Sequence, residues 1–352
     1  MFLPSVNKGG MEKNFFSTAK NLKKRGINLF TISCSKNKFN KKLKIKKKYG
    51  VFELDNLNLS LKFLISFIVL IVKNYQKKIP VLSFQGNILA IIASKIIGCK
   101  IFIRLNSHPD LFLKSSFKKI IFKFFYKMAD QIIVNSRQTQ DNLKKKFSLK
   151  SNLIYNEVDE NEIKTKSKHK IKLKFSNNFP LIISVGRIDE NKNHIFLIET
   201  FNKLKNNIKF NLLIVGSGPL EKILLKKIQD YNLNDIVKIT DYKNNPYPYI
   251  KKSKFFILSS FVEGYPNVLL EAGILRKLVI SSNCNGSKEI INYDERGYLF
   301  NINKFDELKK ILIDLKNQSK LKKKINSLTT YIKKYHKKDN SEKYIDLIFK
   351  NY

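Results

Sequence analysis

Residues 255–272 read FFILSSFVEGYPNVLLEA and contain, in order, an apolar run, a polar loop with glycine and proline, and a stretch with helical spacing. The run at 255–258 is typical of a buried strand, and residues 267–275 are typical of a helix. Glu263 lies in the loop, and Glu271 lies further along the helix. A strand, a loop and a helix in this order predict one unit of a parallel sheet that is covered by helices.

The same alternation extends to both sides of this stretch. In the second half, further strands are expected at 180–185, 210–215, 237–240, 278–282 and 298–300, and helices at 195–205, 218–231 and 305–328. In the first half, strands are expected at 28–33, 81–84, 100–105, 131–135 and 152–155, and helices include 11–25, 87–97 and 116–128. The sequence therefore predicts an α/β protein with two parallel-sheet domains.

A charged stretch at 157–178 shows no sustained apolar period and is typical of an interdomain linker. We expect a first domain over residues 1–157, joined by the C-terminal helix of residues 340–352. A linker over 158–179 and a second domain over 180–339 follow. Ligands of such sheets bind beyond the carboxyl ends of the strands, so we expect the site in a cleft between the domains.

The composition is strongly basic. The 352 residues include 68 Lys plus Arg and 28 Asp plus Glu, a formal net charge of +40, and 43% are hydrophobic. That apolar content excludes global disorder. The three cysteines are far apart and form no metal-ligand spacing, which predicts a reduced compartment and no structural metal.

The charge suggests three kinds of partner: nucleic acid, an anionic membrane surface or a phosphorylated small molecule. A general bias toward lysine is the alternative, in which runs such as 41–48 are solvated faces. The most apolar run, 63–72, is shorter than the roughly 20 residues of a membrane span, so it predicts a buried helix. The N-terminus lacks the pattern of a signal peptide. We expect a cytoplasmic protein and keep open a peripheral position on the inner face of the membrane.

Gly186 follows a predicted strand and precedes Arg187 and Lys192. A guanidinium fork and an ammonium can together hold the oxygens of a diphosphate. In so basic a chain, the same spacing also arises by chance.

A second glycine turn contains Gly216 and Gly218 and superficially suggests a dinucleotide-binding turn. Glu221 stands where the third glycine of that pattern belongs. A structural turn is therefore favoured, with Pro219 in the first turn of the following helix.

The loop between Glu263 and Glu271 offers the amides of a helix start, which can receive phosphate oxygens with help from the helix dipole. The two carboxylates would then lie on either side of the bound anion. In the alternative interpretation, Glu263 is an ordinary loop residue and Glu271 forms a salt bridge.

Taken together, these motifs resemble those of the family 4 retaining glycosyltransferases, which have the GT-B fold of two Rossmann-like domains facing each other across a cleft. The matching residues are Gly186, Arg187, Lys192, Gly216, Gly218, Pro219, Asn245, Pro246, Tyr247, residues 259–272, Gly286, Glu289 and Ile290. They cover the second domain nearly from end to end. The first domain matches more loosely, at residues 2–5, 9–12, 134–136 and 154–159.

The resemblance implies a nucleotide-sugar site that needs no metal ion. Arg187 and Lys192 would neutralise the donor diphosphate, Glu263 would contact the transferred sugar, and Glu271 would hold the ribose hydroxyls. The other donor-binding residues that it implies are Gly10, Gly264, Asn267, Val268 and Tyr242, with Lys243 beside the base.

His108 follows a first-domain strand where members of this family often place an active-site histidine. Asn106 could be the equivalent residue, and a capping role beside Pro109 is the alternative for His108.

Two departures from the family pattern bear on geometry. Arg276 stands where a glycine usually ends the helix, so it should adopt a positive φ. Met1 appears inside the first strand, so we expect the true start to lie upstream.

The resemblance implies a retaining glycosyltransferase that moves a hexosyl or N-acetylhexosaminyl group from a nucleotide-sugar, expected to be a UDP-sugar, to a glycan or lipid-linked acceptor. Its motifs are most similar to those of enzymes that build surface polysaccharides or lipid-linked oligosaccharides. The basic, apolar helix at 117–128 could dock on an anionic membrane, or it could be a core-facing helix with a lysine rim.

Two rival functions stay open: a sugar-nucleotide epimerase or phosphorylase of the same fold, and a basic nucleic-acid-binding protein. The second would need its charge on one face. Lysine is instead spread through both halves, so we expect no nucleic-acid partner.

Overall fold

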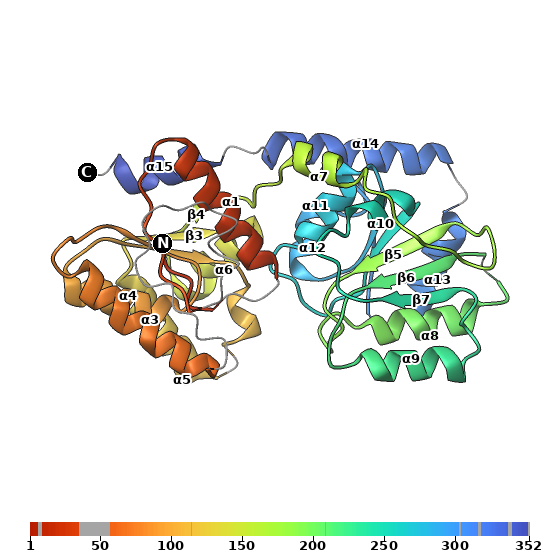
Figure 1. Ribbon diagram of the computed structural model, residues 1–352, viewed down its shortest axis with the longest axis horizontal. Helices are drawn as coiled ribbons and strands as arrows, with labels where there is room; N and C mark the ends of the chain where they lie inside the picture. The colour runs from red at the N-terminus through yellow and green to blue at the C-terminus, as the bar shows by residue number, and fades with distance from the viewer. Residues whose placement is uncertain are drawn as a thin grey trace. The chain divides into compact units, whose positions relative to one another are not determined.

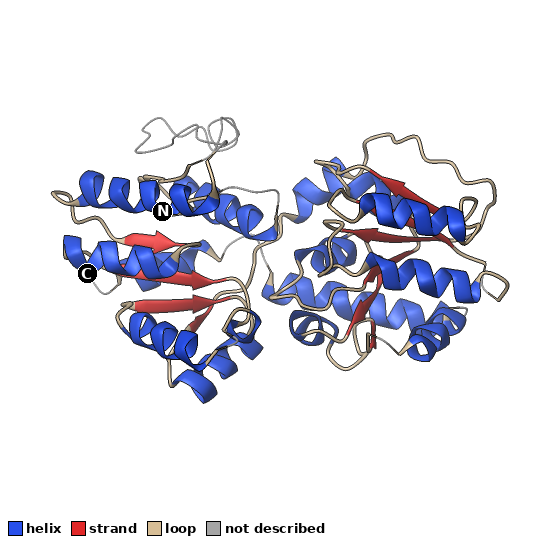
Figure 2. Ribbon diagram, turned by 90° about the horizontal axis from the view of Figure 1, so that it is seen from below, coloured by secondary structure: helices blue, strands red, loops and turns tan. Residues whose placement is uncertain are grey.

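The structure is a computed structural model that describes residues 1–5, 9–34, 57–113, 115–207, 209–302, 304–315, 318–336 and 340–350. The lysine run at 41–48 lies outside these residues. The chain divides into two compact units: Met1–Glu157 with Asp339–Tyr352, and Val158–Lys338. In each unit, helices cover both faces of a parallel sheet (Figure 1, Figure 2). The predicted α/β fold with two parallel sheets is confirmed.

The second unit holds, within the described residues, a six-stranded parallel sheet in the order β10-β9-β8-β5-β6-β7. Its strands are β5 Leu181–Val185, β6 Asn211–Val215, β7 Val237–Thr240, β8 Phe255–Leu258, β9 Leu278–Ser282 and β10 Tyr298–Phe300. Its helices are α7 Glu160–Lys166, α8 His194–Leu204, α9 Glu221–Asp230, α10 Tyr247–Lys252, α11 Asn267–Ile274, α12 Asn285–Ile291, α13 Phe305–Asp314 and α14 Gln318–Tyr335.

The core of this unit forms because its central strands are apolar on both sides, as parallel strands between helix layers must be. Ile182, Ile257 and Ile280 pack with Leu197 of α8 and Leu308 of α13 in one buried cluster. This packing fixes β5 and β8 side by side in the middle of the sheet.

Gly216 and Gly218 have a structural role in this unit, as the sequence favoured. A Cβ on Gly216 would lie 1.8 Å from the carbonyl oxygen of Gly186, and one on Gly218 would lie 2.2 Å from that of Ile188. The two glycines therefore let the loop after β6 pass directly against the loop after β5. Pro219 lies before α9 and not in its first turn, because Leu220 is the N-cap, which corrects the prediction.

The first unit holds, within the described residues, a four-stranded parallel sheet in the order β1-β2-β3-β4. Its strands are β1 Val81–Ser83, β2 Ile101–Leu105, β3 Gln131–Val134 and β4 Asn152–Leu153. Its helices are α1 Gly10–Lys24, α3 Leu59–Asn74, α4 Asn87–Ile97, the 3-10 helix η1 Pro109–Leu111, α5 Ser116–Lys127, α6 Arg137–Phe147 and α15 Ser341–Phe349. Phe2 forms parallel bridges to Ile32 and Ser83, so residues 1–5 run beside β1.

Side chains alternate between two buried clusters in this sheet, as a strand period of two requires. Phe102 and Ile133 pack with residues of α1 and α15. Ile101 and Ile103 pack on the other face with residues of α3, α4, α5 and α6.

Three predicted elements are corrected. The helix expected at 305–328 is two helices, α13 and α14. The stretch expected to be a linker contains α7, which packs on α10 and α11 and belongs to the second unit. The strand expected at 28–33 is reduced in the structure to an isolated bridge at Ile32.

The helix α3 is not buried as predicted. It packs on α4 and buries Ser66, Leu70 and Asn74, while Leu64, Ile68 and Val72 are exposed. Apolar content alone does not say which face of a helix meets a core. Within the described part of the chain, no helix has the length and apolar character to cross a bilayer.

Candidate active site

Two loops of the second unit meet at the carboxyl edge of its sheet. One connects β5 to α8 and carries residues 186–193, and the other connects β8 to α11 and carries residues 259–266. β5 and β8 pair in parallel, so both loops leave the sheet at the same edge. This is the edge at which ligands of such sheets bind.

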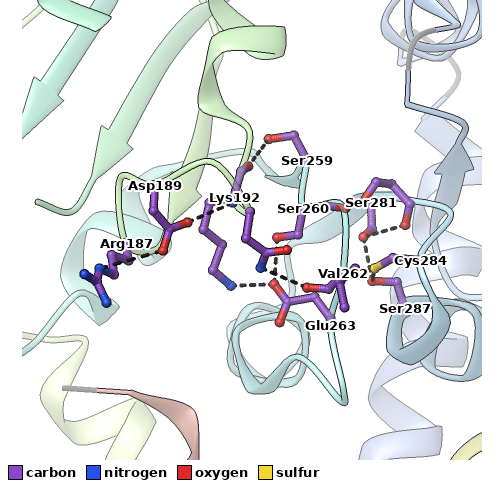
Figure 3. Close-up of polar contacts among 12 residues, drawn as sticks. Arg187, Asp189, Lys192, Ser259, Ser260, Val262, Glu263, Ser281, Cys284 and Ser287 are labelled. Atoms are coloured by element: carbon purple, nitrogen blue, oxygen red, sulfur yellow. Dashed lines mark hydrogen bonds and ion pairs between the residues drawn. The ribbon is translucent and has the colours of Figure 1, made fainter. Parts of the chain in front are cut away.

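Hydrogen bonds join the two loops directly (Figure 3). The Ser259 hydroxyl donates to the carbonyl of Lys192 at 2.8 Å. The Asn191 side-chain amide donates to the carbonyl of Val262 at 3.0 Å, and the Phe261 amide donates to the carbonyl of Asn191 at 2.8 Å. The backbone around Lys192 is thereby fixed relative to the backbone around Glu263.

Lys192 and Glu263 form an ion pair across this junction. Their side chains are 20% and 14% exposed, so the pair is largely shielded from solvent but still reachable. The Ser260 hydroxyl also donates to Glu263 Oε1 at 2.6 Å, and the Lys192 amide donates to Asp189 Oδ1 at 3.0 Å. The site therefore holds a positioned ammonium next to a positioned carboxylate.

Arg187 is not brought together with Lys192. Its side chain is 69% exposed, and its Nε lies 3.7 Å from Asp189 Oδ2. In Figure 3 the Arg187 guanidinium lies beyond Asp189, whereas Lys192 Nζ points at Glu263. Of the two cations predicted to bind the diphosphate, Lys192 lies in the ion pair with Glu263, and Arg187 is exposed to solvent.

The helix α11 begins directly after the loop that carries Glu263 and Gly264. Its N-cap is Pro266, which makes no side-chain capping hydrogen bond, and Asn267 and Val268 form its first turn. Glu271 is buried within this helix. Its burial does not decide between the ribose-binding role and the salt bridge that the sequence left open.

The start of α12 supports the same loop. The Gly286 amide donates to the carbonyl of Glu263 at 3.1 Å, and a Cβ on Gly286 would lie 2.6 Å from the carbonyl oxygen of Gly264. The motif residues Gly286, Glu289 and Ile290 lie in this helix.

Tyr242 and Lys243 follow β7, which ends at the same sheet edge. β7 is the outermost strand on its side, two positions from β5, and Tyr242 is exposed.

The remaining predicted residues belong to the first unit. Gly10 is the first residue of α1, after an N-cap at Gly9. His108 is buried before η1, with Nδ1 3.7 Å from Asp110 Oδ2, and burial lowers its pKa. Asn106 is fixed by hydrogen bonds, because it accepts from Arg104 Nε at 3.2 Å and donates to the carbonyl of Phe84 at 3.1 Å.

Sequence reasoning did not single out the residues that position the ion pair. Ser260 binds the carboxylate, and the Ser282 hydroxyl in turn donates to the carbonyl of Ser260 at 2.5 Å. Asn191 joins the loops. The sequence does contain a pattern that could have indicated them. Polar side chains directly follow apolar strands, and ligands of parallel sheets bind at this end of the strands.

Solved structures of other proteins show the fold class of this chain. HepE of Anabaena, solved in complex with UDP, superimposes with a TM-score of 0.81 over 100% of this chain and 99% of its own, at 17% identity. The chain therefore has the GT-B-like α/β fold.

The family model is matched by part of the sequence. Residues 165–334, which are most of the second unit, match the model of the glycosyl transferases group 1. The predicted resemblance is confirmed.

Two relatives add detail. An N-acetylgalactosamine-N,N'-diacetylbacillosaminyl-diphospho-undecaprenol 4-alpha-N-acetylgalactosaminyltransferase of Campylobacter jejuni is 34% identical over 61% of this chain. That alignment spans 60% of the relative's length. An uncharacterized glycosyltransferase of Haemophilus influenzae is 26% identical over 89% of this chain and 88% of its own.

Proposed function

We propose that this protein is a retaining glycosyltransferase that moves an N-acetylhexosaminyl group from a UDP-sugar to a lipid-linked glycan. The observation that carries the proposal is the Lys192–Glu263 pair, which lies at the carboxyl edge of the sheet within the segment that matches the family. A fixed cation and an adjacent helix N-terminus can bind the diphosphate of a sugar donor, and a fixed carboxylate can bind its sugar hydroxyls.

Lys192 is the group that meets the donor diphosphate. Its ammonium is paired with Glu263 in the structure, so a diphosphate must compete with that carboxylate. As the diphosphate takes the ammonium, Glu263 turns to the hydroxyls of the transferred sugar while Ser260 still holds one of its oxygens. The ion pair thus keeps both groups positioned until the donor arrives.

The start of α11 supplies the second contact to the diphosphate. Backbone amides at Asn267 and Val268 and the positive end of the helix dipole favour an anion there. Glu271, buried in the same helix, binds the ribose hydroxyls. Gly264 contacts the donor from the loop before the helix. Tyr242 lies near the base, and Arg187 turns from solvent toward the phosphates.

The reaction breaks the bond between the anomeric carbon and the diphosphate oxygen, and the electron pair leaves with UDP. The acceptor hydroxyl oxygen forms the new bond to the anomeric carbon, and its proton leaves with the UDP. Charge on the departing diphosphate grows in the transition state, so fixed positive groups lower the barrier. Lys192 and the α11 amides perform this role without a metal ion. The part of the chain that the structure describes has no cluster of three His, Cys, Asp or Glu side chains suited to a metal, and independence from metal stays a prediction. The roles of Gly10 and His108 also stay predictions.

The choice of substrates follows the relatives. The Campylobacter enzyme above and a second one, at 29% identity, are both named as N-acetylgalactosaminyltransferases that act on undecaprenol-linked glycans. HepE was also solved with UDP-glucose. We therefore expect UDP as the nucleotide and an undecaprenyl-diphosphate-linked glycan as the acceptor.

The test is a UDP-release assay with UDP-GalNAc, UDP-GlcNAc and UDP-glucose, with and without an undecaprenyl-diphosphate-linked acceptor. We expect acceptor-dependent release of UDP that persists in EDTA. Release that requires inorganic phosphate would indicate a phosphorylase. A new UDP-sugar without UDP release would indicate an epimerase. Loss of transfer in EDTA that is restored by a divalent cation would contradict the metal-free mechanism.

A further inference from the structure

Exposed apolar side chains are concentrated on the first unit. Of the 18 large apolar side chains that are exposed among the described residues, 11 lie between Leu59 and Phe124. Single exposed apolar residues are ordinary on a protein surface, but a contiguous group marks an interaction site.

Two helices carry most of this group. On α3, Leu64, Ile68 and Val72 follow each other at intervals of four residues and form one stripe. On α5, the exposed residues Phe117, Ile120 and Phe124 form a second stripe at helical spacing. We call these six side chains the α3–α5 face.

The two stripes belong to one surface. α3 and α5 both pack on α4, which places the three helices in one layer (Figure 1). A cavity of about 380 Å³ is lined by Phe63 of α3, Ile88 of α4 and Ile121 of α5, so the helices border a common hollow. The α5 helix has apolar residues on both sides, because Phe122 and Tyr126 are buried toward the core. Packing of the core therefore does not explain why the exposed side of α5 is also apolar.

The charge around the face has one sign. Residues 57–128 contain 11 Lys and one Arg against a single acidic residue, Asp110. That carboxylate is already held by Lys146 Nζ at 2.6 Å. Lys118, Lys119 and Lys127 are exposed on α5 next to the apolar stripe. Helices that lie in the plane of an anionic bilayer interface typically carry a stripe of apolar side chains flanked by lysines. The α3–α5 face has this pattern.

We propose that the α3–α5 face docks on an anionic lipid bilayer, with its six apolar side chains inserted between headgroups and the flanking lysines on lipid phosphates. A second copy of the chain fits less well, because two such faces would bring the same positive charge together. Nucleic acid fits less well too, because Leu, Ile and Val do not stack on bases. The purpose of the docking rests on the proposed function, since a lipid-linked acceptor is held in the bilayer.

The test measures vesicle binding of the full chain without nucleotide-sugar or acceptor, so it does not depend on sugar transfer. Vesicles are phosphatidylcholine alone or with about one third phosphatidylglycerol. The variant F117Q/I120Q/F124Q removes the α5 stripe and keeps the charge. Its matched control is I223Q/L225Q/I313Q, which changes three exposed apolar residues of the second unit. Thermal unfolding checks that both variants fold.

We expect the wild type to bind anionic vesicles, the F117Q/I120Q/F124Q variant to bind at least about tenfold more weakly, and the control to stay within about twofold. Two charge-reversal variants complete the test. K118E/K119E should weaken vesicle binding more than K322E/K323E on α14, where both lysines are also exposed.

Three results would overturn the proposal. Equal binding by the stripe variant and its control would mean that overall charge alone holds the protein on the vesicle. Equal binding of the wild type to neutral and anionic vesicles would remove the role of the lysines. A wild-type dimer that the stripe variant converts to a monomer, measured by light scattering, would assign the face to a second copy. A failure to transfer sugar with normal vesicle binding would instead count against the proposed function.

Discussion

Replacing Lys192 with methionine tests the central ion pair, because methionine keeps most of the side-chain volume and removes the charge. A hydrogen bond to a charged group is worth about 1.5–3 kcal/mol, so UDP should bind about 10- to 150-fold more weakly. The loss of one preorganised charge in the transition state costs about 3 kcal/mol, or about 150-fold in kcat/KM. The Glu263 carboxylate keeps the Ser260 hydrogen bond but loses its cation. The pair is partly exposed, so we expect a stability loss of about 2 kcal/mol, below the cost for a fully buried pair.

The variant E263Q separates this explanation from general damage, because it changes UDP binding in the opposite direction. The glutamine no longer competes for the Lys192 ammonium, so UDP should bind about fivefold more tightly. Sugar transfer should still fall, because the carboxylate that we propose to contact the sugar is gone. Calorimetry with UDP gives the affinities, and UDP release gives kcat/KM. The control is K222M on α9, which removes an exposed lysine of the same unit. UDP affinity and kcat/KM of K192M within twofold of the wild type would refute the role of the pair.

Three further predictions concern stability. G216A should destabilise the second unit by about 3 kcal/mol or more in urea unfolding, because the new Cβ would lie 1.8 Å from the Gly186 carbonyl oxygen, while S217A at the exposed neighbouring position should change little. R276G should raise the unfolding free energy by about 0.5–1 kcal/mol, because Arg276 has φ +56° and glycine adopts this conformation without strain; an unchanged or lower melting temperature would contradict this. Burial raises the pKa of Glu157 from 4.5 to about 7, so the folded state keeps a proton that the unfolded state releases, and stability falls as pH rises through this window. E157Q should therefore match the wild type near pH 4.5 and exceed it by about 3 kcal/mol at pH 8, and parallel stability curves across this range would show the expectation to be wrong.

Much of the fold could be predicted from local patterns. The strands β5, β6, β8 and β9 are short, continuous apolar runs bounded by polar or glycine residues, which is how buried parallel strands read. The positive φ of Arg276 was predicted from the missing glycine and is confirmed. The exposed stripe of α3 was not predicted, because an apolar helix carries no local sign of whether its outer face meets protein or another medium.

The candidate site was predicted in its residues but not in its arrangement. Lys192 and Glu263 were both singled out, yet their pairing across 71 positions was not. The hydrogen bonds that fix this pairing are accepted by the main-chain carbonyls of Lys192, Val262 and Asn191. Every residue has such a carbonyl, so residue types do not reveal these contacts. Arg187 shows the reverse case, since its residue type suggested a phosphate contact while the fold leaves it in solvent.

The return of α15 to the first unit has a consequence for biosynthesis. The buried Arg104 donates a hydrogen bond to the Tyr344 hydroxyl, and Tyr344 and Ile348 complete the core on one face of the first sheet. The ribosome makes this helix only after the whole second unit, which at about 5–20 residues per second is a delay of roughly 10–40 s. Until α15 is made, Leu82, Phe102 and Ile133 lack the part of their apolar cover that Tyr344 and Ile348 supply. The core of the first unit, although most of it is translated first, can therefore be completed only after the second unit has been synthesised.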